Sequence, residues 1–168
     1  MPTWSEICAD PSLEDLPYKI ESNRWGQIVM SPAFFAHSDF QIQLVDLLKK
    51  WAPPGRVMVE CPIQTSDGVR AADVAWMSRQ MYRQHKKTDV MSVAPEVCVE
   101  VISKSNSREQ MREKAALYFE AGAKEVWLCG SSGVMEFFVG SFDHPATSIV
   151  CPQFPLQVIL DDDEEQSE

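Results

Sequence analysis

Several common signatures are absent from this sequence of 168 residues. It has no apolar run of roughly 18 residues, which a membrane-spanning helix would need. Its first residues lack the basic start and apolar stretch of a secretory leader, so we expect a cytoplasmic protein with no membrane partner. The patterns GxxxxGKS/T, GxGxxG, GxSxG and HExxH are also missing. Their absence argues against P-loop enzymes, dinucleotide-dependent dehydrogenases, α/β-hydrolases and zincins, and we expect no organic cofactor.

The cysteines give no sign of a metal knuckle or a disulfide framework. The chain has 5 of them, an odd number, and no two are spaced as CxxC. Cys61, Cys98 and Cys129 lie inside apolar runs. We therefore expect them to act as small hydrophobic residues of the core.

Positive charge is scarce. The chain has 15 Lys and Arg against 25 Asp and Glu, a net charge of −10. Part of the excess lies in residues 161–168, which we predict to be a solvated, disordered acidic tail. Such a chain has no general attraction for nucleic acid, so contact would need a bound cation or a local basic patch. The one basic cluster in the sequence comprises Arg79, Arg83, His85, Lys86 and Lys87. Its default interpretation is a solvated loop, and the alternative is a contact with a phosphate backbone.

The hydrophobic pattern predicts a single domain over residues 1–160, without repeats or an internal linker. It alternates between strand-like and helical periods, which indicates an α/β or α+β domain with a mixed central sheet flanked by helices. We expect helical segments at 11–16, 35–51, 78–87 and 107–121, and strands at 18–22, 25–31, 56–65, 71–77, 95–103, 125–129, 134–139 and within 148–160. Asn106 is the expected N-cap of the last helix, with Glu109 three residues later.

Two carboxylates stand out because they lie in the middle of apolar strands. Asp73 follows two alanines, and Glu100 is flanked by valines. A buried ionised carboxylate costs several kcal/mol unless it is paired or binds a metal. The pair could form structural salt bridges, or could bind a hard cation such as Mg²⁺. Glu60, on the predicted partner strand of Asp73, is expected to face solvent or to play a secondary part.

Two basic side chains could join these acids. Lys114 shares a helical face with Met111, Ala115 and Tyr118, so we expect it on the side that packs against the sheet. There its amine could extend along the apolar surface to solvent or enter the site and stabilise a phosphate. His37 begins the predicted helix at 35–51, where a histidine more often caps or packs than reacts.

An ordered set of short segments resembles the Uma-two family of endonuclease-like proteins. The resemblance spans about residues 12–140, and no single piece of it is specific. It is carried by Glu21 with Gly26-Gln27-Ile28-Val29-Met30-Ser31-Pro32 and His37, by Arg70-Ala71-Ala72-Asp73-Val74-Ala75, by Glu100-Val101-Ile102-Ser103, by Lys114 with Tyr118 and Ala121-Gly122, and by Glu125-Val126-Trp127-Leu128.

The resemblance implies a restriction endonuclease-like fold of the PD-(D/E)xK type and assigns roles to single residues. Asp73 and Glu100 match the motif acids that bind metal, and Glu21 matches an N-terminal Glu that completes the metal shell. Ile102 stands where the usual lysine would be, and the resemblance implies that Lys114 replaces it. Two prolines of the pattern are replaced, one by Ala72 and one by Lys104. His37 matches a recurrent histidine of the family.

The expected function is therefore a Mg²⁺-dependent endonuclease, with Mn²⁺ as an alternative ion, that hydrolyses DNA phosphodiester bonds. Its expected catalytic residues are Asp73, Glu100, Lys114, Glu21 and His37, of which Asp73, Glu100 and Glu21 bind the metal. A homodimer would suit the cutting of both strands of a duplex. Two alternatives stay open: a non-catalytic nucleic-acid-binding or regulatory domain on the same fold, and a phosphodiesterase acting on RNA or a small nucleotide.

Overall fold

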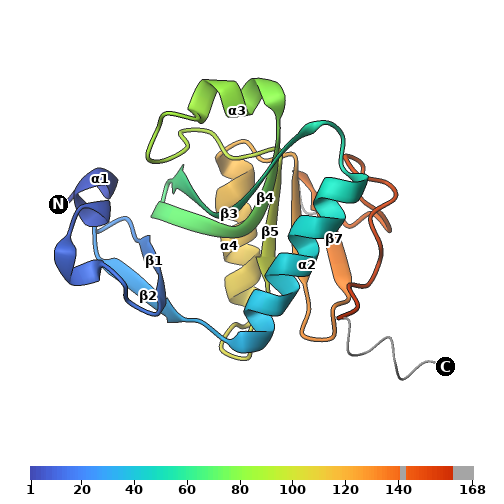
Figure 1. Cartoon of the computed structure of the whole chain (residues 1–168), viewed down its shortest axis with the longest axis horizontal. Coiled ribbons are helices and arrows are strands. Elements are labelled where there is room, and N and C mark those ends of the chain that lie inside the picture. Colours follow the sequence, from blue (N-terminus) through green and yellow to red (C-terminus); the bar gives the residue numbers. More distant parts are fainter. Residues whose placement is uncertain (141–142, 161–168) are drawn as a thin grey trace.

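The structure is a computed structural model, and it describes residues 1–140 and 143–160 (Figure 1). The predicted acidic tail lies outside these residues. In chain order the elements are α1 (Trp4–Cys8), the 3₁₀ turn η1 (Pro11–Leu13), β1 (Tyr18–Ser22), β2 (Ile28–Pro32), α2 (Phe35–Trp51), β3 (Gly55–Thr65), β4 (Gly68–Ser78), α3 (Arg79–His85), β5 (Val97–Val101), α4 (Arg108–Glu120), β6 (Glu125–Cys129) and β7 (Met135–Val139).

The predicted mixed sheet flanked by helices is confirmed. Five strands form it in the order β3-β4-β5-β6-β7. Neighbouring strands are antiparallel except β5 and β6, which are parallel and joined through α4. A parallel pair needs such a crossover because its two strands start at the same edge of the sheet. The strands β1 and β2 form a separate antiparallel pair, which we call the N-terminal hairpin.

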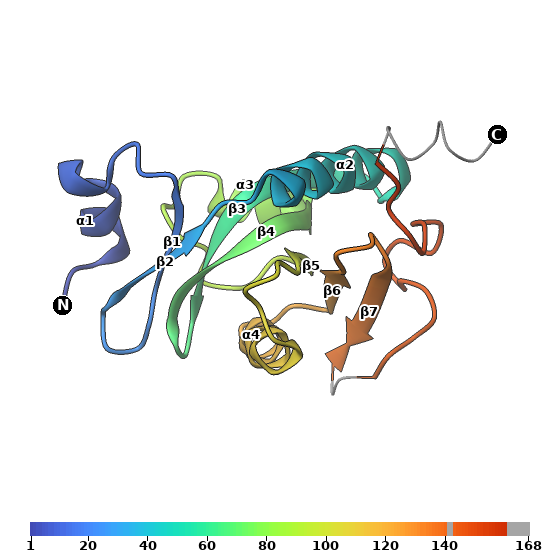
Figure 2. The same cartoon turned by 90° about the horizontal axis from the view of Figure 1, so that it is seen from below.

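The two long helices cover opposite faces of the sheet (Figure 2). Leu44 and Leu48 of α2 are buried in one cluster with Val99 and Trp127. On the other face, Tyr118 of α4 lies in a second cluster. Truncating one such buried leucine to alanine costs about 2–5 kcal/mol, so these contacts fix both helices on the sheet. In the part of the chain that the structure describes, no helix has the length and apolar character needed to cross a bilayer.

Most predicted elements appear within a few residues of their expected ends, but two expectations were wrong and one helix was missed. Residues 148–160 contain no strand, and only an isolated bridge joins Gln157 to Val134. The helix α1 was not anticipated. The N-cap of α4 is Ser107, whose hydroxyl accepts from the Gln110 N–H while the Gln110 side chain accepts from the Ser107 N–H. Asn106 instead accepts from the Ser103 backbone N–H, so its oxygen is used by the preceding turn.

The cysteine expectation is confirmed. Cys61, Cys98 and Cys129 are buried, and all five cysteines are free thiols. Burial raises the pKa of Cys61 to about 12, which keeps this thiol protonated and unreactive.

Candidate active site

The site forms where two central strands part. The ladder between β4 and β5 runs from Trp76 paired with Val97 to Val74 paired with Val99. The next residue along each strand is an acid: Asp73 on β4 and Glu100 on β5, with 1% and 3% of their surfaces exposed. Beyond the ladder, Oδ2 of Asp73 accepts from the backbone N–H of Val101 at 2.8 Å. A side chain thus replaces the missing ladder bond, and both carboxylates face the opening between the strands.

The neighbouring strand β3 is irregular at the same level. Val59 pairs with Val74 and Cys61 with Ala72, and between them Glu60 adopts a φ of 47°. This left-handed conformation is uncommon for a residue other than glycine, and such outliers concentrate at functional sites. The Gln41 side chain of α2 donates to Oε1 of Glu60 at 2.9 Å and to the carbonyl oxygen of Asp73 at 2.7 Å. Glu60 is exposed as expected, yet it is tied to the site by Gln41.

The helix α4 presents Lys114 and Tyr118 to Glu100. Its predicted phase is confirmed, because Met111, Ala115 and Tyr118 are all buried. The Tyr118 hydroxyl donates to Oε1 of Glu100 at 2.6 Å. The Lys114 Nζ lies 3.2 Å from the same oxygen and 2.8 Å from Oε1 of Glu21. Oε1 of Glu100 is therefore fully engaged by α4.

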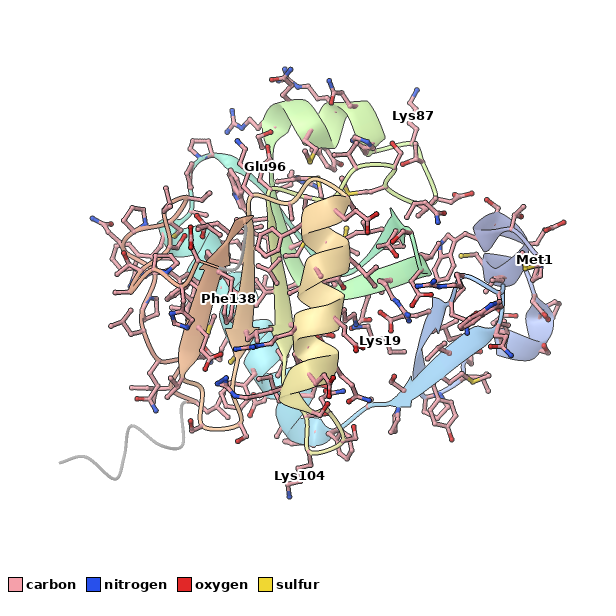
Figure 3. The ribbon with its side chains drawn as sticks, turned by 180° about the vertical axis from the view of Figure 1, so that it is seen from behind. Met1, Lys19, Lys87, Glu96, Lys104 and Phe138 are labelled. Atoms are coloured by element: carbon pink, nitrogen blue, oxygen red, sulfur yellow. The ribbon has the colours of Figure 1, made fainter. Side chains whose placement is uncertain are left out.

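The N-terminal hairpin supplies two further charged groups from alternate positions of β1. Lys19 Nζ lies 2.8 Å from Oδ1 of Asp73 and 3.7 Å from Oε2 of Glu100. Figure 3 shows Lys19 between the hairpin and α4. Glu21 accepts from the backbone N–H of Ala71 at 2.8 Å and pairs with Lys114. Although burial opposes it, these charges hold the pKa of Glu21 below its ordinary value, with Lys114 the larger contributor.

His37 lies in the first turn of α2, with Nε2 3.2 Å from Oδ1 of Asp73. This hydrogen bond raises the pKa of His37. Burial alone would raise the pKa of Asp73, but Lys19 and His37 outweigh it and hold that pKa well below its usual range. Burial, and then the charge of Asp73, raise the pKa of Glu100 to about 7. The two acids thus differ, because the pKa of Asp73 is lowered whereas that of Glu100 is raised.

The donor set fits a hard divalent cation, because carboxylate oxygens are the ligands that Mg²⁺ and Mn²⁺ prefer. Among the described residues, one group of three acids or histidines has donor atoms within 4.8 Å of one another: His37, Glu60 and Asp73. Beside it, Oε2 of Glu100 points to the same side as Oδ1 of Asp73, since both contact Lys19. Glu21 is not in that group.

A cleft of about 780 Å³ opens onto these groups. One wall is the N-terminal segment, including Trp4, Ile7 and Pro11, and the other carries Asp73 and Glu100. The site can therefore be reached from solvent although its carboxylates are buried.

Sequence reasoning anticipated five of the side chains that meet here and missed three. The five are Asp73, Glu100, Lys114, Glu21 and His37; the structure brings all of them to one site. Lys19, Gln41 and the hydroxyl of Tyr118 were not assigned a part. Lys19 carried one usable signal: it lies two residues before Glu21, so in a strand both point to the same face.

The basic cluster lies apart from the carboxylates, on and just after α3. Arg79, Arg83, Lys86 and Lys87 are exposed, and Lys87 lies at the α3 end of the molecule (Figure 3). The guanidinium of Arg56 on β3 adds to it, stacked 4.6 Å from the centre of the Tyr82 ring. The cluster is a solvated surface, but it is organised on a helix and a strand.

A mixed sheet with two acids where its central strands part, and a lysine from the following helix, defines a domain of the restriction endonuclease-like nuclease class. The chain belongs to the Uma2 family, described as "putative restriction endonuclease", whose model matches residues 11–135. A crystal structure of a "putative nuclease" of the DUF820 family from Anabaena variabilis is similar, with a TM-score of 0.68 at 16% identity, covering 86% of this chain and 83% of that one. At this identity the likeness concerns the fold alone. No curated protein matches the chain.

Proposed function

We propose that this protein is a Mg²⁺-dependent endonuclease that hydrolyses DNA phosphodiester bonds, with Mn²⁺ as an alternative ion. One observation carries the proposal. Two buried carboxylates, Asp73 and Glu100, lie side by side where β4 and β5 part, and each has one oxygen turned toward the same cation, Lys19. Buried acids arranged in this way around a cation at the base of an open cleft suit the binding of a metal and a phosphate.

The side chains would have different roles in the proposed reaction. Asp73 and Glu100 would hold the metal, which when bound would polarise a phosphate and acidify an attacking water. Lys114, held by Glu21 at 2.8 Å, would stabilise negative charge that develops on the phosphate. We therefore expect Glu21 to act on the reaction by positioning Lys114. The family resemblance also implies that Glu21 takes part in the metal shell. His37 adds positive charge beside Asp73.

Substrate, assembly and compartment are part of the same proposal. The basic cluster on α3, together with Arg56, would contact the DNA backbone, which compensates locally for the acidic chain. A homodimer would present two sites to the two strands of a duplex. The free thiols agree with a reducing compartment such as the cytoplasm.

A non-catalytic binding domain is the second candidate, and a specific observation favours it. Lys19 and Lys114 already pair with the carboxylates, so the site is electrostatically balanced without a metal. Such a domain would fold and bind nucleic acid while binding no divalent cation.

The deciding experiment titrates Mg²⁺ and Mn²⁺ into the protein by calorimetry and then assays nicking of supercoiled plasmid. The test variant is Asp73→Asn, which keeps the shape of the side chain but removes its charge. Asp46→Asn, the same change at an exposed position of α2, is the matched control. We expect the wild type and the control to bind and nick, and Asp73→Asn to lose about a hundredfold in nicking. A wild type that binds DNA but neither binds metal nor nicks would favour the second candidate.

A further inference from the structure

The oxygens of Asp73 and Glu100 are not equivalent. Oδ2 of Asp73 is committed to the backbone N–H of Val101. Oε1 of Glu100 is committed to the hydroxyl of Tyr118 and to Lys114. Two oxygens remain outside these contacts: Oδ1 of Asp73, which Nε2 of His37 also approaches at 3.2 Å, and Oε2 of Glu100.

Lys19 contacts both remaining oxygens. Its Nζ lies 2.8 Å from Oδ1 of Asp73 and 3.7 Å from Oε2 of Glu100, and the side chain is only 14% exposed. An ammonium group in this place neutralises carboxylates that would otherwise repel each other at close range. Any cation held by the same two oxygens must therefore compete with Lys19.

We propose that Lys19 holds the place of the divalent cation in the metal-free protein, and that metal binding displaces its ammonium group from Asp73 and Glu100. This inference rests on the proposed function, because it presumes a metal at these two carboxylates. Lys19 is thus a positioning residue: it keeps the ligands together before the metal arrives, and it lowers the metal affinity of the site.

The two lysines of the site differ in how they are held. Lys114 lies between Glu21 and the engaged oxygen of Glu100, and a packed helix carries it. Lys19 comes from the N-terminal hairpin, which is not part of the central sheet, and it contacts Oδ1 of Asp73 and Oε2 of Glu100. Displacement should therefore involve Lys19 and leave Lys114 in place.

Calorimetric titration of Mg²⁺ provides the first test. We expect Lys19→Met to bind Mg²⁺ at least about tenfold more tightly than the wild type, within the usual range for coupled ligands. Lys19→Arg should stay within about threefold of the wild type, because it keeps the cation. Lys114→Met controls for the general loss of one positive charge, and its affinity should rise by less than about threefold.

The side-chain ammonium signals of ¹⁵N-lysine-labelled wild type provide a second test, in which Mg²⁺ is added to the unaltered protein. The Lys19 signal is assigned by its absence from the spectrum of Lys19→Arg. On addition of Mg²⁺ we expect that signal to shift or vanish into exchange with water, while the Lys114 signal persists.

The outcomes separate this inference from the proposed function. Mg²⁺ binding by the wild type with an unchanged Lys19 signal, or with equal affinity in Lys19→Met, would overturn the inference and leave the metal nuclease standing. Equal gains in Lys19→Met and Lys114→Met would also overturn it, because they would reflect net charge alone. If neither the wild type nor Lys19→Met binds Mg²⁺, both proposals fail.

Discussion

The central sheet and the N-terminal hairpin both contribute charged groups to the site, but they hold them differently. Asp73 and Glu100 belong to strands buried between two helices, and their exposed fractions are 1% and 3%. Lys19 and Glu21 belong to a two-stranded sheet that meets β4 largely through side chains. The proposed metal ligands therefore lie on the central sheet, and two charged groups that contact them or Lys114 lie on the hairpin.

The attachment of the hairpin follows from the way the strands part. Past Val74, β4 has no ladder partner in β5, so its backbone N–H groups on that side need other acceptors. Two side chains of β1 supply them: Ser22 Oγ accepts from the Val69 N–H at 2.9 Å, and Glu21 accepts from the Ala71 N–H. The hairpin therefore contacts β4 in the same stretch where β4 and β5 part and the site forms.

The largest effect that would test this contrast concerns metal affinity. Glu100→Gln removes an acid of the central sheet, and we expect Mg²⁺ affinity to fall about a hundredfold by calorimetry. Glu21→Gln, on the hairpin, should lower affinity by less than about threefold but reduce nicking strongly, because Lys114 loses the closer of its two acidic partners. Equal loss of affinity in both variants would place Glu21 in the metal shell, as the family resemblance implies.

The contact between the hairpin and β4 should be sensitive to one glycine. Gly68, the first residue of β4 after the turn from β3, has a φ of 82°, and an added Cβ would lie 2.4 Å from the carbonyl oxygen of Ser22. We expect Gly68→Ala to lower the free energy of unfolding by about 2–3 kcal/mol in urea denaturation. Gly140→Ala is the control, because no atom of the described residues lies within 4 Å of its added Cβ. A neutral Gly68→Ala would mean that the hairpin can shift at little cost.

A smaller effect should appear in the pH dependence of stability without metal. Because burial raises the pKa of Glu100 from 4.5 to about 7, the folded protein binds the extra proton between these values. The stabilisation is complete below pH 4.5 and is lost as the pH rises through 7. The raised pKa of His37 acts in the same direction. Between pH 5.5 and 8.5 we expect a loss of about 1–2 kcal/mol in wild type. A slope as steep in Glu100→Gln would exclude Glu100 as its source.

The sequence predicted the charged groups of the central sheet and α4 better than Lys19 of the N-terminal hairpin, for a physical reason. Asp73, Glu100 and Lys114 could be found because an acid in an apolar strand or a lysine on an apolar helical face departs from a periodic background. Lys19 stands in a short strand with partly exposed neighbours, where a lysine is ordinary. Its partners are more than fifty positions away, so only tertiary structure brings them together. The left-handed φ of Glu60 is equally invisible, since glycine is the residue expected there.

The smallest expected effect concerns the neutral hydrogen bond between Ser22 and β4, which attaches the hairpin without using its charged groups. Ser22→Ala removes a neutral acceptor and leaves the Val69 N–H buried without this partner, which should cost about 1 kcal/mol of stability. Since Glu21 directly precedes Ser22 in β1, loosening this point should let Glu21 and Lys114 shift. We therefore expect kcat for nicking to fall several-fold with unchanged Mg²⁺ affinity. Ser131→Ala, at an exposed turn between β6 and β7, should change neither quantity. If Ser22→Ala lowers Mg²⁺ affinity and kcat together, the hairpin contributes to metal binding. The distinction between the central sheet and the hairpin then does not hold.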